Sequence, residues 1–173
     1  ICMLKECINV HIENLTFKYG FEYGFYAENS SNISLYGCEA DHTTLRTNIY
    51  GAKGTTMILN CCKAYKATGD GFGCSDKVRL DLINCTGSYN YDDGVSHHRA
   101  SEGMIVGGVF EYNGKGGIAT PTYNAVVNIY GAISRRNNYG IYAVSESTMP
   151  IATFVANGCI LADNNIAGMF ISR

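Results

Sequence analysis

The segment Ile33-Ser34-Leu35-Tyr36-Gly37-Cys38 alternates apolar and more polar side chains, and a glycine and a small residue follow. The same six-residue pattern occurs seven times along the chain, ending at Leu15, Cys38, Cys62, Cys85, Val109, Ala132 and Cys159. The successive spacings of these end points are 23, 24, 23, 24, 23 and 27 residues. A second apolar column, preceded by Gly or Asn, keeps step with the first: Phe25, Ile49, Phe72, Val95, Ile118, Ile141 and Met169.

Short period-2 segments that return at a fixed interval in this range are typical of a β-solenoid, in which no single coil can bury its apolar face alone. The sequence therefore predicts an all-β, right-handed, single-stranded parallel β-helix of about seven coils of 23–24 residues. No coil offers the ten or more residues of 3.6-residue periodicity that leucine-rich or helical repeats require. The strands of a β-sandwich would not share one register over seven copies.

The composition agrees with short strands and tight turns, with 20 Gly, 13 Tyr, no Trp and 16% charged residues in 173. We expect one β-helix domain over residues 1–173, as a piece of a longer protein, because the N-terminus has neither an initiator Met nor a signal-peptide layout. The net charge of −2 and the absence of a Lys/Arg run argue against nucleic acid and membrane as partners.

The residue before each small-residue position predicts a tight corner in the left-handed region: Asn14, Gly37, Cys61, Asn84, Gly108, Gly131 and Gly158. Cys61 is the exception in residue type, and a locally different turn is expected there. Cys38, Cys62 and Cys85 share one inward column and predict an interior stack of thiols. A metal or redox cluster is the alternative, but no metal site is predicted.

The residue after each apolar position of the second column should face solvent: Tyr26, Tyr50, Gly73, Ser96, Ala119, Tyr142 and Phe170. Small residues flanked by aromatic ones predict a shallow groove whose ends stack on sugar rings. Tyr26, Tyr50, Ser96 and Tyr142 are accordingly candidate substrate-binding residues. The alternative is that outward tyrosines are simply good strand formers.

Three carboxylates precede the second column in successive coils, Asp70 in one and Asp92 with Asp93 in the next. Because stacked coils place equivalent residues roughly 5 Å apart, these groups should converge and raise at least one pKa. Carboxyls with separated pKa values serve general acid and base catalysis at a glycosidic bond. The same cluster could hold Ca²⁺, and Asp before Gly is also ordinary turn chemistry.

Further ionisable residues lie beside this cluster. Alternation points His97 inward as a core histidine, whereas His98 at the following turn is the candidate proton shuttle. Arg99 and Lys115 are candidates to neutralise a substrate carboxylate.

Thr68-Gly69-Asp70-Gly71 and Asp92-Asp93-Gly94-Val95 resemble two motifs of the polygalacturonase family, within the pectin-lyase-like superfamily. The resemblance implies that Asp70, Asp92 and Asp93 protonate the leaving oxygen and activate water. Gly114-Lys115-Gly116-Gly117 lacks the His of the family's third motif, and Asn138-Tyr139-Gly140 stands where that family has Arg-Ile-Lys. Asp92 to His98 is also similar to β-helix repeats of phage tailspike proteins, which implies a homotrimer.

These observations predict a polysaccharide-processing protein, a glycoside hydrolase or a polysaccharide lyase acting on an acidic glycan. A lyase would take its positive charge from Lys115, Arg99 or bound Ca²⁺. The alternative is a non-catalytic glycan-binding adhesin or structural module, such as a tailspike. Either function implies an extracellular, cell-surface or virion location.

Overall fold

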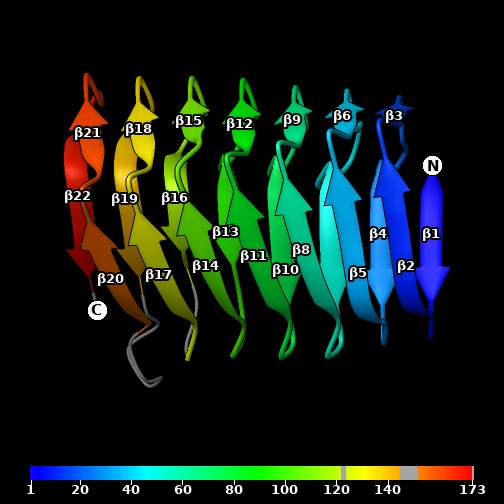
Figure 1. Cartoon of the computed structure of the whole chain (residues 1–173). Coiled ribbons are helices and arrows are strands. Elements are labelled where there is room, and N and C mark those ends of the chain that lie inside the picture. Colours follow the sequence, from blue (N-terminus) through cyan, green and yellow to red (C-terminus); the bar gives the residue numbers. More distant parts are fainter. Residues whose placement is uncertain (122–123, 145–151, 173) are drawn as a thin grey trace.

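The computed structural model describes residues 1–121, 124–144 and 152–172, and the strands of these residues form three parallel sheets. No helix occurs in this part of the chain. Figure 1 shows the coils side by side, from the N-terminal coil at the right to the C-terminal coil at the left. The predicted parallel β-helix of about seven coils is confirmed.

Each coil gives one strand to each sheet. Sheet A contains β1 (Cys2–Lys5), β4 (Phe25–Glu28), β7 (Ile49–Ala52), β10 (Phe72–Ser75), β13 (Val95–His97), β16 (Gly116–Thr120), β19 (Tyr139–Val144) and β22 (Ala167–Ser172). Sheet B contains β2 (Ile8–Glu13), β5 (Ser31–Tyr36), β8 (Thr56–Asn60), β11 (Arg79–Ile83), β14 (Glu102–Val106), β17 (Val126–Tyr130) and β20 (Thr153–Asn157). Sheet C, along the top of Figure 1, contains β3 (Thr16–Lys18), β6 (Glu39–Asp41), β9 (Lys63–Tyr65), β12 (Thr86–Ser88), β15 (Val109–Glu111), β18 (Ile133–Arg135) and β21 (Ile160–Ala162).

The register of sheet A is the one that the sequence predicts. Tyr26 pairs with Tyr50, Tyr50 with Gly73, and the outward column continues through Ser96, Ala119, Tyr142 and Phe170. The inward column of Phe25, Ile49, Phe72, Val95, Ile118 and Ile141 is buried in the core. One residue of slip would exchange these two columns, so burial of the apolar column holds the register.

The corner between sheets B and C, which we call the tight corner, places one residue of each coil in the left-handed region. Cys61 has a φ of 52° there, close to the 53° of Asn14 and the 50° of Asn84. The expectation of a different turn at Cys61 is therefore wrong, because neighbouring coils impose one backbone path on all of them. Inside this corner, Cys38, Cys62 and Cys85 are buried, unbridged thiols, as predicted.

The predicted alignment of the fifth coil is wrong by one residue. Val109 pairs with Thr86 rather than with Cys85, and Gly107 rather than Gly108 takes the left-handed position of Asn84. The cause lies in sheet B, where Gly103 stands in the place of an apolar residue. A Cβ atom on Gly103 would lie 2.1 Å from Leu80 O and 2.5 Å from His97 Nε2. The apolar pattern is broken there because buried His97 fills the space.

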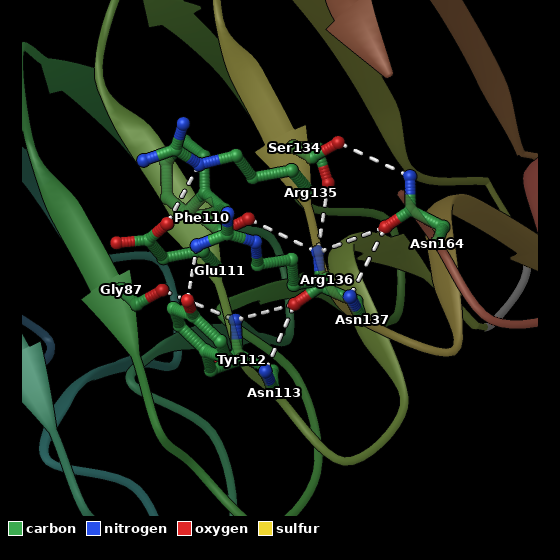
Figure 2. Close-up of polar contacts among 10 residues, drawn as sticks. All are labelled: Gly87, Phe110, Glu111, Tyr112, Asn113, Ser134, Arg135, Arg136, Asn137 and Asn164. Atoms are coloured by element: carbon green, nitrogen blue, oxygen red, sulfur yellow. Dashed lines mark hydrogen bonds and ion pairs between the residues drawn. The ribbon is translucent and has the colours of Figure 1, made fainter. Parts of the chain in front are cut away.

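The corner between sheets C and A, which we call the wide corner, holds the longer connections. Buried Asn90, Asn113 and Asn137, followed by Asn164, stack inside it. Asn113 Nδ2 donates to Gly87 O (3.1 Å) and to Asn137 Oδ1 (3.0 Å), and Asn137 repeats this toward Phe110 O and Asn164 (Figure 2). This asparagine ladder satisfies the backbone of the loops and holds them rigidly against one another.

Candidate functional site

The three carboxyls come together at the N-terminal ends of two neighbouring strands of sheet A, β10 and β13. Asp70 lies two residues before β10, and Asp92 and Asp93 precede β13 in the next coil. One oxygen from each of the three lies within 4.8 Å of the others. The backbone N–H of Asp93 donates to Asp70 Oδ1 (3.2 Å), and the N–H of Gly116 donates to Asp93 Oδ1 (2.7 Å). The predicted convergence is confirmed.

The three carboxyls differ in exposure. Asp93 is 1% exposed and Asp70 is 8% exposed, whereas 43% of the Asp92 side chain is accessible. Burial, and next the neighbouring Asp92 carboxylate, raise the pKa of Asp70 to about 7. Burial and the Asp70 and Asp92 charges raise the pKa of Asp93 well above its ordinary value. The cluster thus combines two buried carboxyls with raised pKa values and one carboxyl that water reaches.

Lys115 supplies the positive charge of the cluster. Its Nζ lies 3.5 Å from Asp92 Oδ1 and 4.9 Å from the centre of the Tyr142 ring. Burial disfavours the charged amine, but Asp93 and Asp92 outweigh it and raise the pKa of Lys115. Lys115 therefore joins the carboxyls to the aromatic side chains at the C-terminal end of sheet A.

The two histidines separate as alternation predicts. His97 is fully buried, and burial lowers its pKa to about 4. His98 is half-buried rather than open to solvent, because its Nε2 shares a hydrogen bond with Ser96 Oγ (2.6 Å). Burial, with the charges of Lys115 and Arg99, lowers the pKa of His98 to about 4, so the imidazole is neutral at pH 7. Arg99 lies beyond the other end of β13 and is 3.6 Å from Asp76.

The aromatic residues of sheet A form two groups. The first contains Tyr26 and Tyr50, which stack at 6.2 Å and 10°, and Tyr23 of the preceding loop packs against both rings. The second contains Tyr139, Tyr142 and Phe170, in which Tyr142 and Phe170 stack at 5.9 Å and 11°.

The prediction of a shallow groove between these two groups is wrong for its floor, which is largely covered. Ser96 and Ala119 are both 0% exposed, although they point outward. The His98 side chain lies over Ser96 and is hydrogen-bonded to its Oγ. The Tyr50 ring lies against Gly73, where an added Cβ atom would be 3.0 Å from the ring. Large neighbours fill the room that small residues leave, so most of this floor is closed.

An open cleft of about 800 Å³ lies instead on the wide corner. It is lined by Tyr89, Asn90, Tyr91, Asp92, Tyr112, Asn113, Gly114, Lys115, Arg136, Asn138 and Asn165. Sequence reasoning found Asp92 and Lys115 but missed Tyr89, Tyr112 and Arg136. Their spacings of 23 and 24 residues were the available signal.

A bound divalent cation would find few ligands in the carboxyl cluster. Ca²⁺ takes six to eight oxygen ligands, whereas the cluster brings together three carboxyls, two of which have raised pKa values. Lys115 already lies beside the third carboxyl.

The whole chain, residues 1–173, matches the family model described as right handed beta helix region, and the protein belongs to this family. Among solved structures, the chain is similar to the periplasmic alginate epimerase AlgG, with a TM-score of 0.78 and 13% identity over 98% of this chain. A double mutant of the same enzyme matches with a TM-score of 0.77 and 13% identity, also over 98% of this chain. The chain spans about half the length of these two structures, 47% and 46%. No curated protein matches the chain.

At this level of identity the similarity shows that the fold is shared. The right-handed β-helix predicted from the repeat is confirmed by the family and by these structures. The described residues contain no helix long and apolar enough to span a membrane.

Proposed function

We propose that this chain is the carbohydrate-active part of an enzyme that cleaves an acidic polysaccharide by hydrolysis. The observation that carries the proposal is the contrast within one carboxyl cluster: Asp70 has a pKa of about 7, and accessible Asp92 is paired with Lys115 at 3.5 Å. A buried carboxyl with a raised pKa beside an accessible carboxyl provides a general acid and a second carboxyl that can reach the sugar.

In this proposal Asp70 protonates the leaving oxygen of the glycosidic bond, and Asp92 acts on the opposite side of the sugar. The oxygens of the cluster lie within 4.8 Å of one another. This is closer to the roughly 5 Å of retaining glycosidases than to the roughly 6.5–9.5 Å of inverting ones. Asp93, 1% exposed and bonded to the Gly116 N–H, positions the cluster rather than touching substrate.

The acidic character of the substrate follows from Lys115. Its ammonium group, between Asp92 and the Tyr142 ring, suits a sugar that carries a carboxylate beside an apolar face. Alginate, the acidic polysaccharide in the name of the structural neighbour AlgG, belongs to this chemical class.

Two observations favour other functions. Neutral His98 near Lys115 would suit elimination, in which a base removes the proton α to the uronate carboxylate. The closed floor over Ser96 and Ala119 suits a module that binds glycan without cleaving it. An extracytoplasmic location follows from any of these functions, because polysaccharides of this kind lie outside the cytoplasm.

The test is a panel of alginate, polygalacturonate and neutral glucans, assayed with and without EDTA for reducing ends and for absorbance near 235 nm. Hydrolysis gives reducing ends without absorbance and is insensitive to EDTA. We expect Asp92→Asn to lower kcat/KM by about 10² to 10⁴ and exposed Asp163→Asn to leave it unchanged. Absorbance would instead indicate a lyase, and binding without any product would indicate the non-catalytic module.

A further inference from the structure

The cleft on the wide corner has a chemical composition of its own. Two cations, Lys115 and Arg136, three tyrosines and several asparagine amides line it, and Asp92 is the one acidic side chain among the lining residues. Lys115 lies 3.5 Å from Asp92 and offsets its charge. The remaining charge of the cleft is therefore the guanidinium of Arg136.

Arg136 is held in place by aromatic rather than acidic partners. Its guanidinium lies over the Tyr112 ring, 5.2 Å from the ring centre, and Nη1 donates to the Tyr112 hydroxyl. In the described part of the chain no carboxylate forms an ion pair with Arg136, whereas adjacent Arg135 binds Glu111 at 2.7 Å. Arg136 thus offers further N–H donors in a fixed orientation, which suits a planar carboxylate.

The tyrosines extend this arrangement along the corner. Tyr89 and Tyr112 stack with centroids 4.8 Å apart and planes 4° apart, so Tyr89, Tyr112 and Arg136 form one column over three coils. Tyr91 is 80% exposed and makes no ring contact with another aromatic residue in the described ranges. A flat, exposed ring in the same cleft as a fixed cation is suited to stack against a sugar ring.

Beneath the cleft, the asparagine ladder makes the site rigid. Asn113 accepts hydrogen bonds from the backbone N–H (3.1 Å) and the side chain (2.9 Å) of Asn90. It donates in turn to Asn137, as Figure 2 shows. The loops that bear the cleft residues are thus bonded to one another through side-chain amides. Such preorganisation lowers the entropic cost of binding.

From these contacts we propose that the corner cleft binds an acidic sugar residue, with its carboxylate on Arg136 and its ring against Tyr91. Because Asp92 and Lys115 line both this cleft and the carboxyl cluster, the bound glycan would reach the cluster across the wide corner rather than along sheet A. The nature of the ligand rests on the proposed function, but the existence of the site does not require turnover.

The chain contains no tryptophan, so a single Trp reports on the cleft alone. Tyr91→Trp places it at the cleft, and Phe21→Trp places it on the same corner three coils earlier, outside the cleft. We would titrate both variants with tetrasaccharides of alginate and galacturonate and with neutral cellotetraose, and verify by mass spectrometry that the sugars stay intact. The expected result is saturable change of emission with an acidic tetrasaccharide in Tyr91→Trp only.

Second variants in the Tyr91→Trp background assign the contacts. Arg136→Gln should weaken binding about tenfold or more, as expected for loss of a charged hydrogen bond, and Arg136→Lys should restore part of it. Tyr89→Asn should weaken binding about threefold, because the column loses one stacked ring. The matched variants Arg46→Gln and Tyr19→Asn, exposed on the same corner outside the cleft, should not change it.

The inference is overturned if emission of Tyr91→Trp does not respond to the acidic tetrasaccharides, if cellotetraose binds equally well, or if Arg136→Gln binds as tightly as its parent. These outcomes are distinct from failure of the proposed function. A chain that binds through Arg136 but releases no product refutes hydrolysis alone, and a chain that hydrolyses with unchanged KM in Arg136→Gln refutes the corner site alone.

Discussion

The two corners that flank sheet C are built from the same repeat but do different things. Both place one residue of each coil at a φ near 55°, for example Cys61 at the tight corner and Tyr89 at the wide corner. At the tight corner two residues separate the strands, for example Cys61 and Cys62 between β8 and β9. Its backbone N–H groups bond to the carbonyl groups of the next coil, as Cys61 does with Ile83. Thiols that need only weak partners can therefore fill its interior.

The wide corner has several loop residues per coil, so its backbone needs additional hydrogen-bond partners. The asparagine ladder supplies them, and the chain outside the ladder is then free to carry Tyr89, Asp92, Lys115 and Arg136. The buried amides therefore allow this corner to hold a site, whereas the thiol-filled corner contributes packing alone.

The largest expected effect comes from breaking the ladder at its centre. Asn113→Ala removes the partners of Gly87 O and of the Asn90 amide, and should lower the free energy of unfolding by about 3 kcal/mol or more, because buried groups lose their hydrogen bonds. Urea unfolding of the variant and of the wild type measures this change in the free energy of unfolding. Exposed Asn165→Ala on the same corner should change stability by less than about 0.5 kcal/mol; equal effects of the two would show that the ladder has no special role.

The next effect concerns pH. In the folded chain Asp70 has a pKa of about 7, above the value of about 4 in an unfolded chain, so its contribution to stability is full below pH 4 and is lost as pH rises through about 7. As pH rises from 4.5 to 7, the free energy of unfolding of Asp70→Asn should therefore increase by about 2 to 3 kcal/mol relative to that of the wild type.

The free energy of unfolding of Asp70→Asn has to be compared with that of the wild type at each pH, because His97 and His98 change the stability of both proteins in the opposite direction. Each has a pKa of about 4 in the folded chain and of about 6.5 in an unfolded chain. Their contribution to stability is therefore full above about pH 6.5 and is lost as pH falls through 4. Urea unfolding at pH 4.5, 5.5, 6.5 and 7 measures both curves. Parallel curves would contradict the raised pKa of Asp70.

A smaller effect is expected inside the tight corner. Cys62→Ala removes one buried sulfur and its weak hydrogen bond to Leu35 O (3.5 Å), and should cost about 1 kcal/mol through the small cavity left. A cost as large as that of Asn113→Ala would erase the distinction between the two corners.

The smallest effect is a gain in stability. Cys61→Gly relieves a side chain held at a φ of 52° and should stabilise the fold by about 0.5 kcal/mol, because relief of left-handed strain exceeds the extra flexibility of the unfolded chain. The urea midpoint should rise with an unchanged slope. A lower midpoint would mean that the thiol, 3.2 Å from Asn60 Oδ1, contributes more than the strain costs.

Much of the site was predictable because register and alternation are local rules. Counting coils from the second column was enough to bring Asp70 next to Asp92 and Asp93 and to turn His97 inward. The closed floor over Ser96 could not be predicted, since whether His98 and Tyr50 lie over small neighbours depends on rotamers chosen in three dimensions.

The repeat pattern alone predicts the parallel β-helix, the register of sheet A, the thiol stack and the meeting of three carboxyls, because a fixed repeat stacks equal positions at the strand spacing. The folded structure adds which carboxyls are buried, how Lys115 is shared between Asp92 and Tyr142, and that the open cleft lies on the wide corner. Those properties depend on how side chains from different coils and different sheets fill a common volume, and no periodicity along one chain encodes that.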